Sequence, residues 1–499
     1  MNIHPVLIRC IKMFKKHICS SSVYYFSLFL VLLVFFSQVH PLLPFDTDDW
    51  KYSGLARLPY PTLCAWNPTK VFPECFQPLV GLFAAYIVTP LLGDYISALV
   101  VSHAIVVSLF ITGYFYSIHK LLEWKFSISS VSIFFIVSIL VLLHFLALVT
   151  RSSNNDHLFY SPDVNCYYNY IVPNMLCASI GLWLMRHDIS VIKGTVRISI
   201  LLFLTFLALF SNLYSTVILI AIVGAKLLLA LFEADKKQQR WLSAYIRNNA
   251  FLLLVIFIWL FVQYYEANGS RATSYGAMLL PFGESLKQAI TLFCSIHYNK
   301  WFLAFTIAAI LFAITYRMIK ERRMPFDARR MSATIILASF LTVIYIILLS
   351  SQVFPKYLLR SDVMFTYLFF YILSVGMCLG YLTSKLKHVR VFYPFLVFFF
   401  FFLMNTNENT FVDLQYPYGT DLQTCESFDR DVIRQVEDAE LMGKDTVTIL
   451  VHDYKTTSNW PLMPNQGKYV GLTLFKHGII KRNVVTVFER ESAENTHNP

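Results

Sequence analysis

Three aspartates within four residues form the motif with the clearest chemical potential. They stand in the segment Asp46-Thr47-Asp48-Asp49-Trp50. Carboxylates this close repel one another. Such a cluster can bind a divalent cation, or it can keep one carboxyl group at a raised pKa beside ionised neighbours, as a general base requires. The simpler alternative is a solvated loop with a helix cap. Asp46, Asp48 and Asp49 are therefore our candidate catalytic residues, and Asp46 and Asp48 the candidate ligands of a metal that the chemistry permits but does not require.

Two cations in a later segment could bind phosphate. Lys356 and Arg360 stand four residues apart in segment 351–362, directly before an apolar run. If that segment is an α-helix, both side chains point to one face, where an arginine fork and a lysine suit phosphate oxygens. Arg151 is a further single cation of this kind. Snorkelling toward lipid phosphates is the alternative for all three.

Aromatic and polar side chains near these charges could contact a sugar. Trp50 and Tyr52 follow the aspartates and could stack on a sugar ring, and His157 belongs to a polar, tyrosine-rich stretch at 151–173. We predict all three as substrate-binding residues. Anchoring at the membrane interface is the simpler role for tryptophan and tyrosine at such positions.

The composition indicates what must position these residues. Of the 499 residues, 57% are hydrophobic and only 14% are charged, against about a quarter in an ordinary soluble chain. We therefore predict an all-α polytopic membrane protein. The net charge of +11 gives no support to nucleic-acid binding, because the basic residues form short clusters between apolar runs. The sequence also lacks a P-loop, an HExxH motif and a GxSxG motif.

Hydropathy predicts about eleven membrane-spanning helices, since roughly 20 apolar residues cross the hydrocarbon core. We place them at 23–42, 95–118, 127–149, 169–186, 197–211, 213–231, 250–266, 301–318, 333–350, 363–384 and 389–404. The run 197–231 is divided at Ser211-Asn212. The apolar stretch 79–93 is only fifteen residues long, so we expect it to lie in the outer interface or to re-enter the membrane.

The positive charges predict the orientation of these helices. With the N-terminus in the cytoplasm, the inner segments carry 22 Lys and Arg residues and the outer segments carry 9. We expect residues 1–22 to be cytoplasmic, 23–404 to form the membrane domain with an outer loop at 44–94, and 405–499 to form a small α/β domain on the outer side. That tail alternates predicted helices and strands, with strands at 446–451 and 484–488.

This layout resembles a known family. A first membrane helix followed by an outer loop that opens with an Asp-rich motif is similar to the GT-C membrane glycosyltransferases, here carried by Asp46, Asp48 and Asp49. The helix count, the inner N-terminus and the outer C-terminal domain look most like the serotype-converting O-antigen glucosyltransferases of enteric bacteria and their phages. The resemblance implies a bacterial inner-membrane protein, a polyprenyl-phosphate sugar as donor, and a lipopolysaccharide O-antigen or other glycan as acceptor.

The expected activity is therefore an inverting hexose transfer in which an aspartate of 46–49 acts as the base. A flippase for the lipid-linked sugar is the first alternative. The predicted spans, however, contain one clear interior charge, Lys226, and no acid, which is little for ion coupling. An O-antigen polymerase is the second alternative, although those enzymes typically carry their large outer loop later in the chain.

Overall fold

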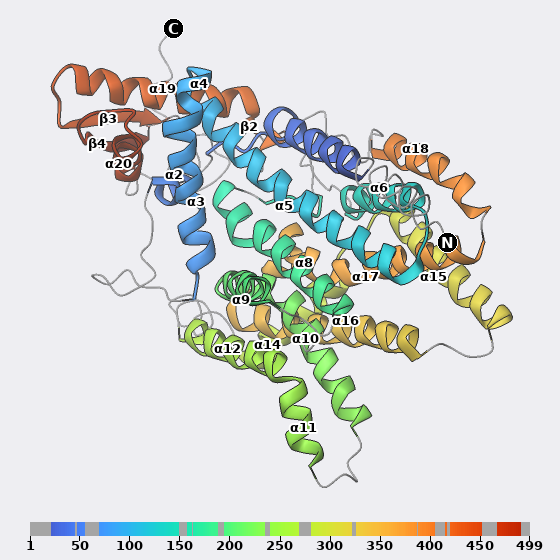
Figure 1. The fold of residues 1–499 in the computed structure, drawn as a ribbon. Helices are drawn as coiled ribbons and strands as arrows, with labels where there is room; N and C mark the ends of the chain where they lie inside the picture. Colours follow the sequence, from blue (N-terminus) through green and yellow to red (C-terminus); the bar gives the residue numbers. More distant parts are fainter. Residues whose placement is uncertain are drawn as a thin grey trace, which may run out of the picture.

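The protein is described here by a computed structural model, which is mostly helical (Figure 1). It describes residues 21–44, 47–54, 69–148, 157–161, 163–187, 194–234, 240–268, 281–321, 326–386, 388–404, 415–416, 420–451 and 467–490. Asp46 and Arg151, together with most of the predicted cytoplasmic N-terminus, lie outside these residues.

Within the described residues, eight helices are long and apolar enough to cross a membrane: Ser21–Val39, Val71–Leu92, Tyr95–Phe126, Leu213–Glu233, Ala250–Ala267, Lys300–Lys320, Asp327–Val353 and Ser361–Lys385. Three further apolar helices are shorter: Ser130–Leu146, Thr195–Leu209 and Val389–Met404. At 1.5 Å per residue, the eight longer helices match the thickness of the hydrocarbon core. The predicted class, an all-α polytopic membrane protein, is confirmed at this level.

The helices of the first half have these bounds: η1 Phe35–Val39, α2 Thr47–Gly54, α3 Val71–Phe83, η2 Ala84–Val88, α4 Thr89–Leu92, α5 Tyr95–Phe126, α6 Ser130–Leu146, α7 Val164–Cys166, η3 Tyr167–Ile171, α8 Val172–Arg186, α9 Thr195–Leu209, α10 Leu213–Glu233 and α11 Trp241–Asn248. The second half continues with α12 Ala250–Ala267, α14 Phe282–Cys294, α15 Lys300–Lys320, α16 Phe326–Val353, η5 Pro355–Leu359, α17 Ser361–Lys385, η6 Val389–Phe392, α18 Tyr393–Met404, α19 Leu422–Leu441 and α20 Lys468–Lys476. The strands are β1 Gln415–Tyr416, β2 Thr420–Asp421, β3 Thr446–Val451 and β4 Val485–Arg490.

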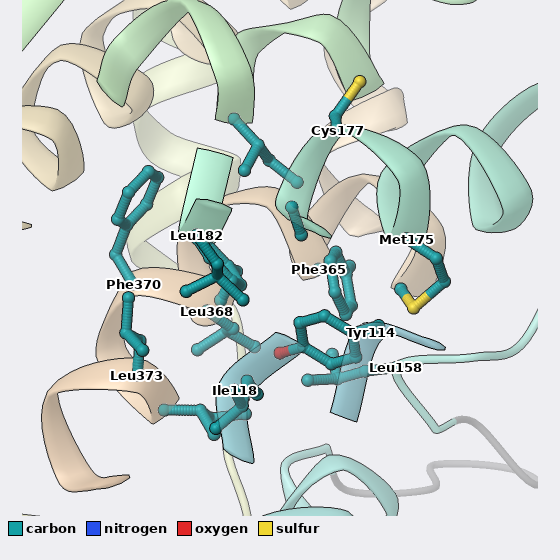
Figure 2. Packing of buried hydrophobic residues seen from close by; sticks show 14 of the residues in the cluster. Tyr114, Ile118, Leu158, Met175, Cys177, Leu182, Phe365, Leu368, Phe370 and Leu373 are labelled. Carbon is teal, nitrogen blue, oxygen red and sulfur yellow. The ribbon is translucent and has the colours of Figure 1, made fainter. Parts of the chain in front are cut away.

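The main core lies between α5, α6, α8 and α17, whose apolar side chains interlock around Tyr114 and Phe365 (Figure 2). Two histidines expected to be packing residues are buried there with partners. His103 Nδ1 lies 2.8 Å from the Tyr168 hydroxyl, and His144 Nε2 lies 3.1 Å from the Tyr114 hydroxyl. Their burial therefore leaves these ring nitrogens hydrogen-bonded.

The apolar run 197–231 is divided where the sequence predicts. Helix α9 ends at Leu209 and α10 begins at Leu213. Between them Asn212 adopts an extended conformation, and its side chain accepts a hydrogen bond from the backbone N–H of Tyr214 at 3.0 Å. This N-cap stabilises the start of α10 and gives the chain its turn.

The stretch 79–93 belongs to a longer helix, α3–η2–α4, which runs from Val71 to Leu92. In Figure 1 this helix runs across the direction of α5 rather than alongside it. At its start, Phe72 N–H donates to the carbonyl of Phe210 at 3.0 Å. Just past its end, Asp94 pairs with Arg430 of α19 at 3.0 Å. The two ends therefore contact the α9–α10 turn and the C-terminal segment.

The C-terminal segment contains α19, β3, α20 and β4, with both strands close to where the sequence places them. Strands β3 and β4 pair in parallel, Thr446 opposite Val485 and Val451 opposite Arg490. Their buried face shares one apolar cluster with residues of α2, η2 and α5, including Trp50 and Leu474. The C-terminal segment thus packs directly on the helix that carries Asp48 and Asp49 (Figure 1).

Candidate functional site

Arg360 lies at the start of α17 and is paired with Asp362 through two hydrogen bonds. Its Nε donates to Oδ1 at 3.0 Å and its Nη2 to Oδ2 at 2.6 Å. The preceding residues, Pro355–Leu359, form a 3-10 helix rather than an α-helix. Because a 3-10 helix has about three residues per turn, positions four apart point roughly 120° away from each other. The expectation that Lys356 and Arg360 share one face is therefore wrong, and Lys356 is exposed.

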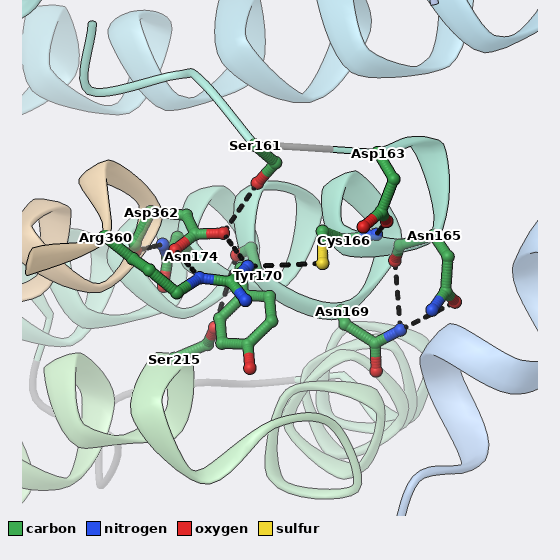
Figure 3. Close-up of polar contacts among 10 residues, drawn as sticks. All are labelled: Ser161, Asp163, Asn165, Cys166, Asn169, Tyr170, Asn174, Ser215, Arg360 and Asp362. Atoms are coloured by element: carbon green, nitrogen blue, oxygen red, sulfur yellow. Dashed lines mark hydrogen bonds and ion pairs between the residues drawn. The ribbon is translucent and has the colours of Figure 1, made fainter. Parts of the chain in front are cut away.

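Asp362 is the most buried charged group of this cluster, with only 1% of the residue exposed. Ser161 Oγ donates a second hydrogen bond to Oδ2 at 2.7 Å, and Asn174 Nδ2 donates to the backbone carbonyl of Asp362 at 2.8 Å (Figure 3). A buried carboxylate needs such donors as well as a counter-charge. The cluster therefore joins α8, α17 and the loop before α7 at one point.

The guanidinium of Arg360 has further neighbours besides Asp362. Its carbon lies 4.5 Å from the ring centre of Tyr170 and 5.6 Å from that of Tyr357. Its Nη2 also contacts Cys166 Sγ at 3.2 Å. Within the described residues, no hydrogen bond from Nη1 to the protein is found, so this nitrogen can donate to a bound anion.

Asp163 lies between Arg360 and the acidic loop. It caps α7, because its Oδ1 accepts a hydrogen bond from the backbone N–H of Cys166 at 2.6 Å. Burial raises the pKa of Asp163. The hydrogen bond from Cys166 and the charge of Arg360 act against this shift, and the carboxylate of Asp48 adds to it. Asp48 and Arg360 are therefore both close enough to influence one carboxyl group.

The two described aspartates of the acidic motif lie on α2 in different environments. Asp49 is fully buried, and its Oδ1 accepts a hydrogen bond from the backbone N–H of Asn165 at 2.6 Å. Asp48 is only half-buried. The structure thus joins the acidic loop to the segment 163–170 that also contacts Arg360, which the sequence alone could not show.

The position of α2 is fixed from the far end of the chain. Thr473 Oγ1 donates to the carbonyl of Trp50 at 2.7 Å, and His477 Nε2 lies 3.1 Å from the carbonyl of Ser53. A carbonyl can only accept, so Nε2 carries the proton and Nδ1 accepts from the Tyr95 hydroxyl at 2.6 Å. Burial lowers the pKa of His477 to about 4, consistent with a neutral ring.

The predicted sugar-stacking residues are placed differently from expectation. Trp50 is only 2% exposed and belongs to the apolar cluster with α20, so it has no open face for a sugar. His157 is fully buried with its ring 4.8 Å from that of Phe145, and burial lowers its pKa well below the usual value. Tyr52 alone remains half-buried, with the Lys51 ammonium 5.0 Å from its ring centre.

A polar pocket adjoins the rings that cover Arg360. It is lined by Lys70, Tyr170, Asn212, Leu213, Tyr214, Gln263, Glu266, Ala267, Leu349, Gln352, Val353 and Tyr357. Amide, carboxylate and hydroxyl groups on tyrosine-rich walls can hydrogen-bond and stack on a sugar. Sequence reasoning missed Asp362, Lys70 and Glu266. The closeness of Arg360 and Asp362 in sequence was the available signal for the first, whereas the pocket joins residues from distant helices.

The predicted metal site finds no support in the described residues. Among them, no group of three or more histidine, cysteine, aspartate or glutamate side chains is placed to hold a metal ion. One oxygen of Asp49 accepts a backbone hydrogen bond, and Asp46 is not described. Cys75, Cys166 and Cys425 are free thiols.

Comparisons of the chain with protein-family models, with curated proteins and with solved structures found no match.

Proposed function

We propose that this protein is a membrane glycosyltransferase that moves a hexose from a polyprenyl-phosphate donor to a glycan acceptor on the side of the membrane opposite the N-terminus. In the reaction, a carboxylate takes the proton of an acceptor hydroxyl, and the hydroxyl oxygen forms a bond to the anomeric carbon. The bond between that carbon and the phosphate oxygen breaks, and the lipid phosphate leaves with the electron pair. The configuration at the anomeric carbon inverts.

The observation that supports this proposal most strongly is the convergence of acid and base groups around Asp163. Asp48 and Arg360 come from elements more than 300 residues apart, yet both influence the carboxyl group of Asp163. An acid that accepts a proton and a cation that binds the leaving phosphate are the two groups that such a transfer needs. The adjoining pocket offers hydrogen-bonding groups for a sugar.

The burial of each group suggests its role. Asp48 is half-buried and is the better candidate for the base, whereas buried Asp49 accepts a backbone hydrogen bond and positions α2. Arg360 Nη1, and Lys70 on the pocket wall, are the groups that we assign to the donor phosphate. A role for Lys356, as an exposed cation, would require the donor to approach from outside the pocket.

The orientation of the chain is part of the proposal, with eleven crossings, an inner N-terminus and an outer C-terminus. The contacts at both ends of α3–η2–α4 support it, because Phe210 and Arg430 both belong to segments assigned to the outer side. This helix then lies along the outer face and does not cross. A cysteine at exposed position Lys356 should be labelled from outside intact cells, and one at Lys320 only after permeabilisation. The reverse pattern would overturn the orientation.

The decisive experiment compares surface polysaccharide from cells with the wild-type protein, the Asp48→Asn variant and no protein. We expect a gain of one hexose per repeat unit with the wild type only. Asp438→Asn, on the exposed face of α19, is the matched control and should behave as the wild type. Full transfer by an Asp48→Asn, Asp49→Asn double variant would overturn the proposed mechanism. Movement of the donor lipid across vesicles without any transfer would favour the flippase.

A further inference from the structure

The largest described cavity lies far from the Arg360 cluster, between α15, α16 and α17. Its volume is about 640 Å³. Most of its wall is apolar, from residues such as Ile310, Ile335 and Met377, and one end carries Lys125 and Arg317. An apolar slot with cations at one end matches the chemistry of a lipid with an acidic headgroup.

The depth of the slot fits one leaflet of a bilayer. Its lining on α15 extends from Ile310 to Glu321, and on α17 from Tyr371 to Tyr381. At 1.5 Å per residue these stretches are about 15–16 Å long. That is about half the ~30 Å thickness of the hydrocarbon core. The slot therefore runs from the ends of the helices to the middle of the membrane.

The slot is accessible from the lipid side. Three of its lining residues are largely exposed in the isolated chain: Ile314 at 49%, Met318 at 78% and Ile336 at 70%. An acyl chain can therefore enter sideways from the bilayer without passing through the protein. Ala313, by contrast, is 5% exposed and forms part of the inner wall, where a larger side chain would fill the space.

The charges at the mouth favour an anion. Glu321 is the acid that lines the slot, and it pairs with Lys385 at 2.7 Å and with Arg317 at 3.7 Å. Asp327 acts on Lys125 electrostatically. Three cations thus face two acids, and Arg317 retains donors for a phosphate because its pairing with Glu321 is long.

We infer that this slot binds one anionic glycerophospholipid from the leaflet at that end of the protein. The phosphate lies against Lys125 and Arg317, and one acyl chain lies along Ile310 and Met377. A glycerophospholipid fits better than a long polyprenyl chain because the slot ends after the depth of one leaflet. This inference is independent of the proposed sugar transfer, since the lining residues belong to none of the elements around Arg360.

The test is native mass spectrometry of the whole protein released from mixed phosphatidylglycerol and phosphatidylcholine micelles. The wild type should retain one phosphatidylglycerol, and the Lys125→Gln, Arg317→Gln variant should lose the preference for it at least tenfold. Ala313→Trp should retain neither lipid. Lys320→Gln and Ala308→Trp, on exposed positions of the same helix outside the slot, are the matched controls and should behave as the wild type.

Two results would overturn the inference. One is equal retention of both lipids by the wild type. The other is unchanged phosphatidylglycerol retention in Ala313→Trp, provided that this variant elutes as a monodisperse protein like Ala308→Trp. If Ala313→Trp does not fold, the smaller Ala313→Leu replaces it, with the same expected loss of retention and the same criterion for rejection.

Discussion

The guanidinium of Arg360 and the carboxylate of Asp362 are joined by two hydrogen bonds of 3.0 and 2.6 Å. They stand only two residues apart, at the first turn of α17, where an acid also interacts favourably with the helix dipole. Asp362 is almost completely buried, while 26% of the Arg360 side chain is exposed. Arg360 therefore compensates a buried charge and still has one nitrogen available for a ligand.

Arg360→Ala should destabilise the protein by about 3 kcal/mol, at the low end for breaking a buried ion pair because Arg360 is partly exposed. The carboxylate of Asp362 would lose its counter-charge. Unfolding of the purified protein in detergent measures the effect. Adding Asp362→Asn to this variant should recover part of the stability but none of the transfer activity. Equal stability of the two variants would show that the buried charge is compensated elsewhere.

Asp48 and Asp49 should differ when each is substituted. Asp49→Ala removes the acceptor of the Asn165 N–H, and a buried donor left unsatisfied costs about 1–3 kcal/mol. Asp48→Asn should abolish transfer without changing the melting temperature. Both quantities can be measured on the same preparations. Loss of stability in Asp48→Asn comparable to that in Asp49→Ala would assign Asp48 a structural role instead.

The packing of α2 on α20 should not tolerate a methyl group at Gly54. A Cβ there would lie 2.2 Å from Thr473 Oγ1 and 2.8 Å from its backbone Cα. Gly54→Ala should therefore displace α2 and reduce both transfer and thermal stability. Gly113→Ala is the control, since a Cβ at Gly113 meets nothing within 4 Å. Identical behaviour of the two variants would argue against close packing of α2 on α20.

Asp429 should make stability depend on pH. It is buried on α19, and its Oδ2 has no hydrogen-bond partner among the described residues. Burial raises its pKa well above the ordinary value, with Arg430 opposing and Glu426 adding to the shift.

As the pH rises above about 4, the unfolded chain releases the proton of Asp429 before the folded chain does. The wild type should then lose stability relative to Asp429→Asn, and the difference should grow until the pH passes the folded pKa. Melting temperatures from pH 4 to 8 measure it, with Asp438→Asn as the exposed control. A constant difference over this range would mean that Asp429 titrates normally.

Local sequence patterns predicted much of the helical framework. The break between α9 and α10 was predictable because Ser211-Asn212 interrupts an apolar run and asparagine is a good N-cap. The strand β3 was predictable from its flanking turn and its own residues. The length of α3–η2–α4 was not, because Pro78 and Pro90 divide its sequence while the helix continues through both.

The candidate site was predictable only in part. Asp48, Asp49 and Arg360 could be proposed from their residue types, but their common neighbour Asp163 depends on the fold. The apolar partners of Trp50 come from α20, more than 400 residues later, so its burial carries no local signal. The 3-10 turn before Arg360 follows from Pro355 and Phe354, whose extended conformation prevents an α-helix from continuing.

The bond between Thr473 and Trp50 also fixes an order of assembly. The second helix of the chain cannot reach its final packing until the last thirty residues have been synthesised and transferred to the same side of the membrane. A nascent or prematurely ended chain would therefore insert its membrane helices and remain inactive. Biogenesis itself would then delay the onset of chemistry until translation is complete.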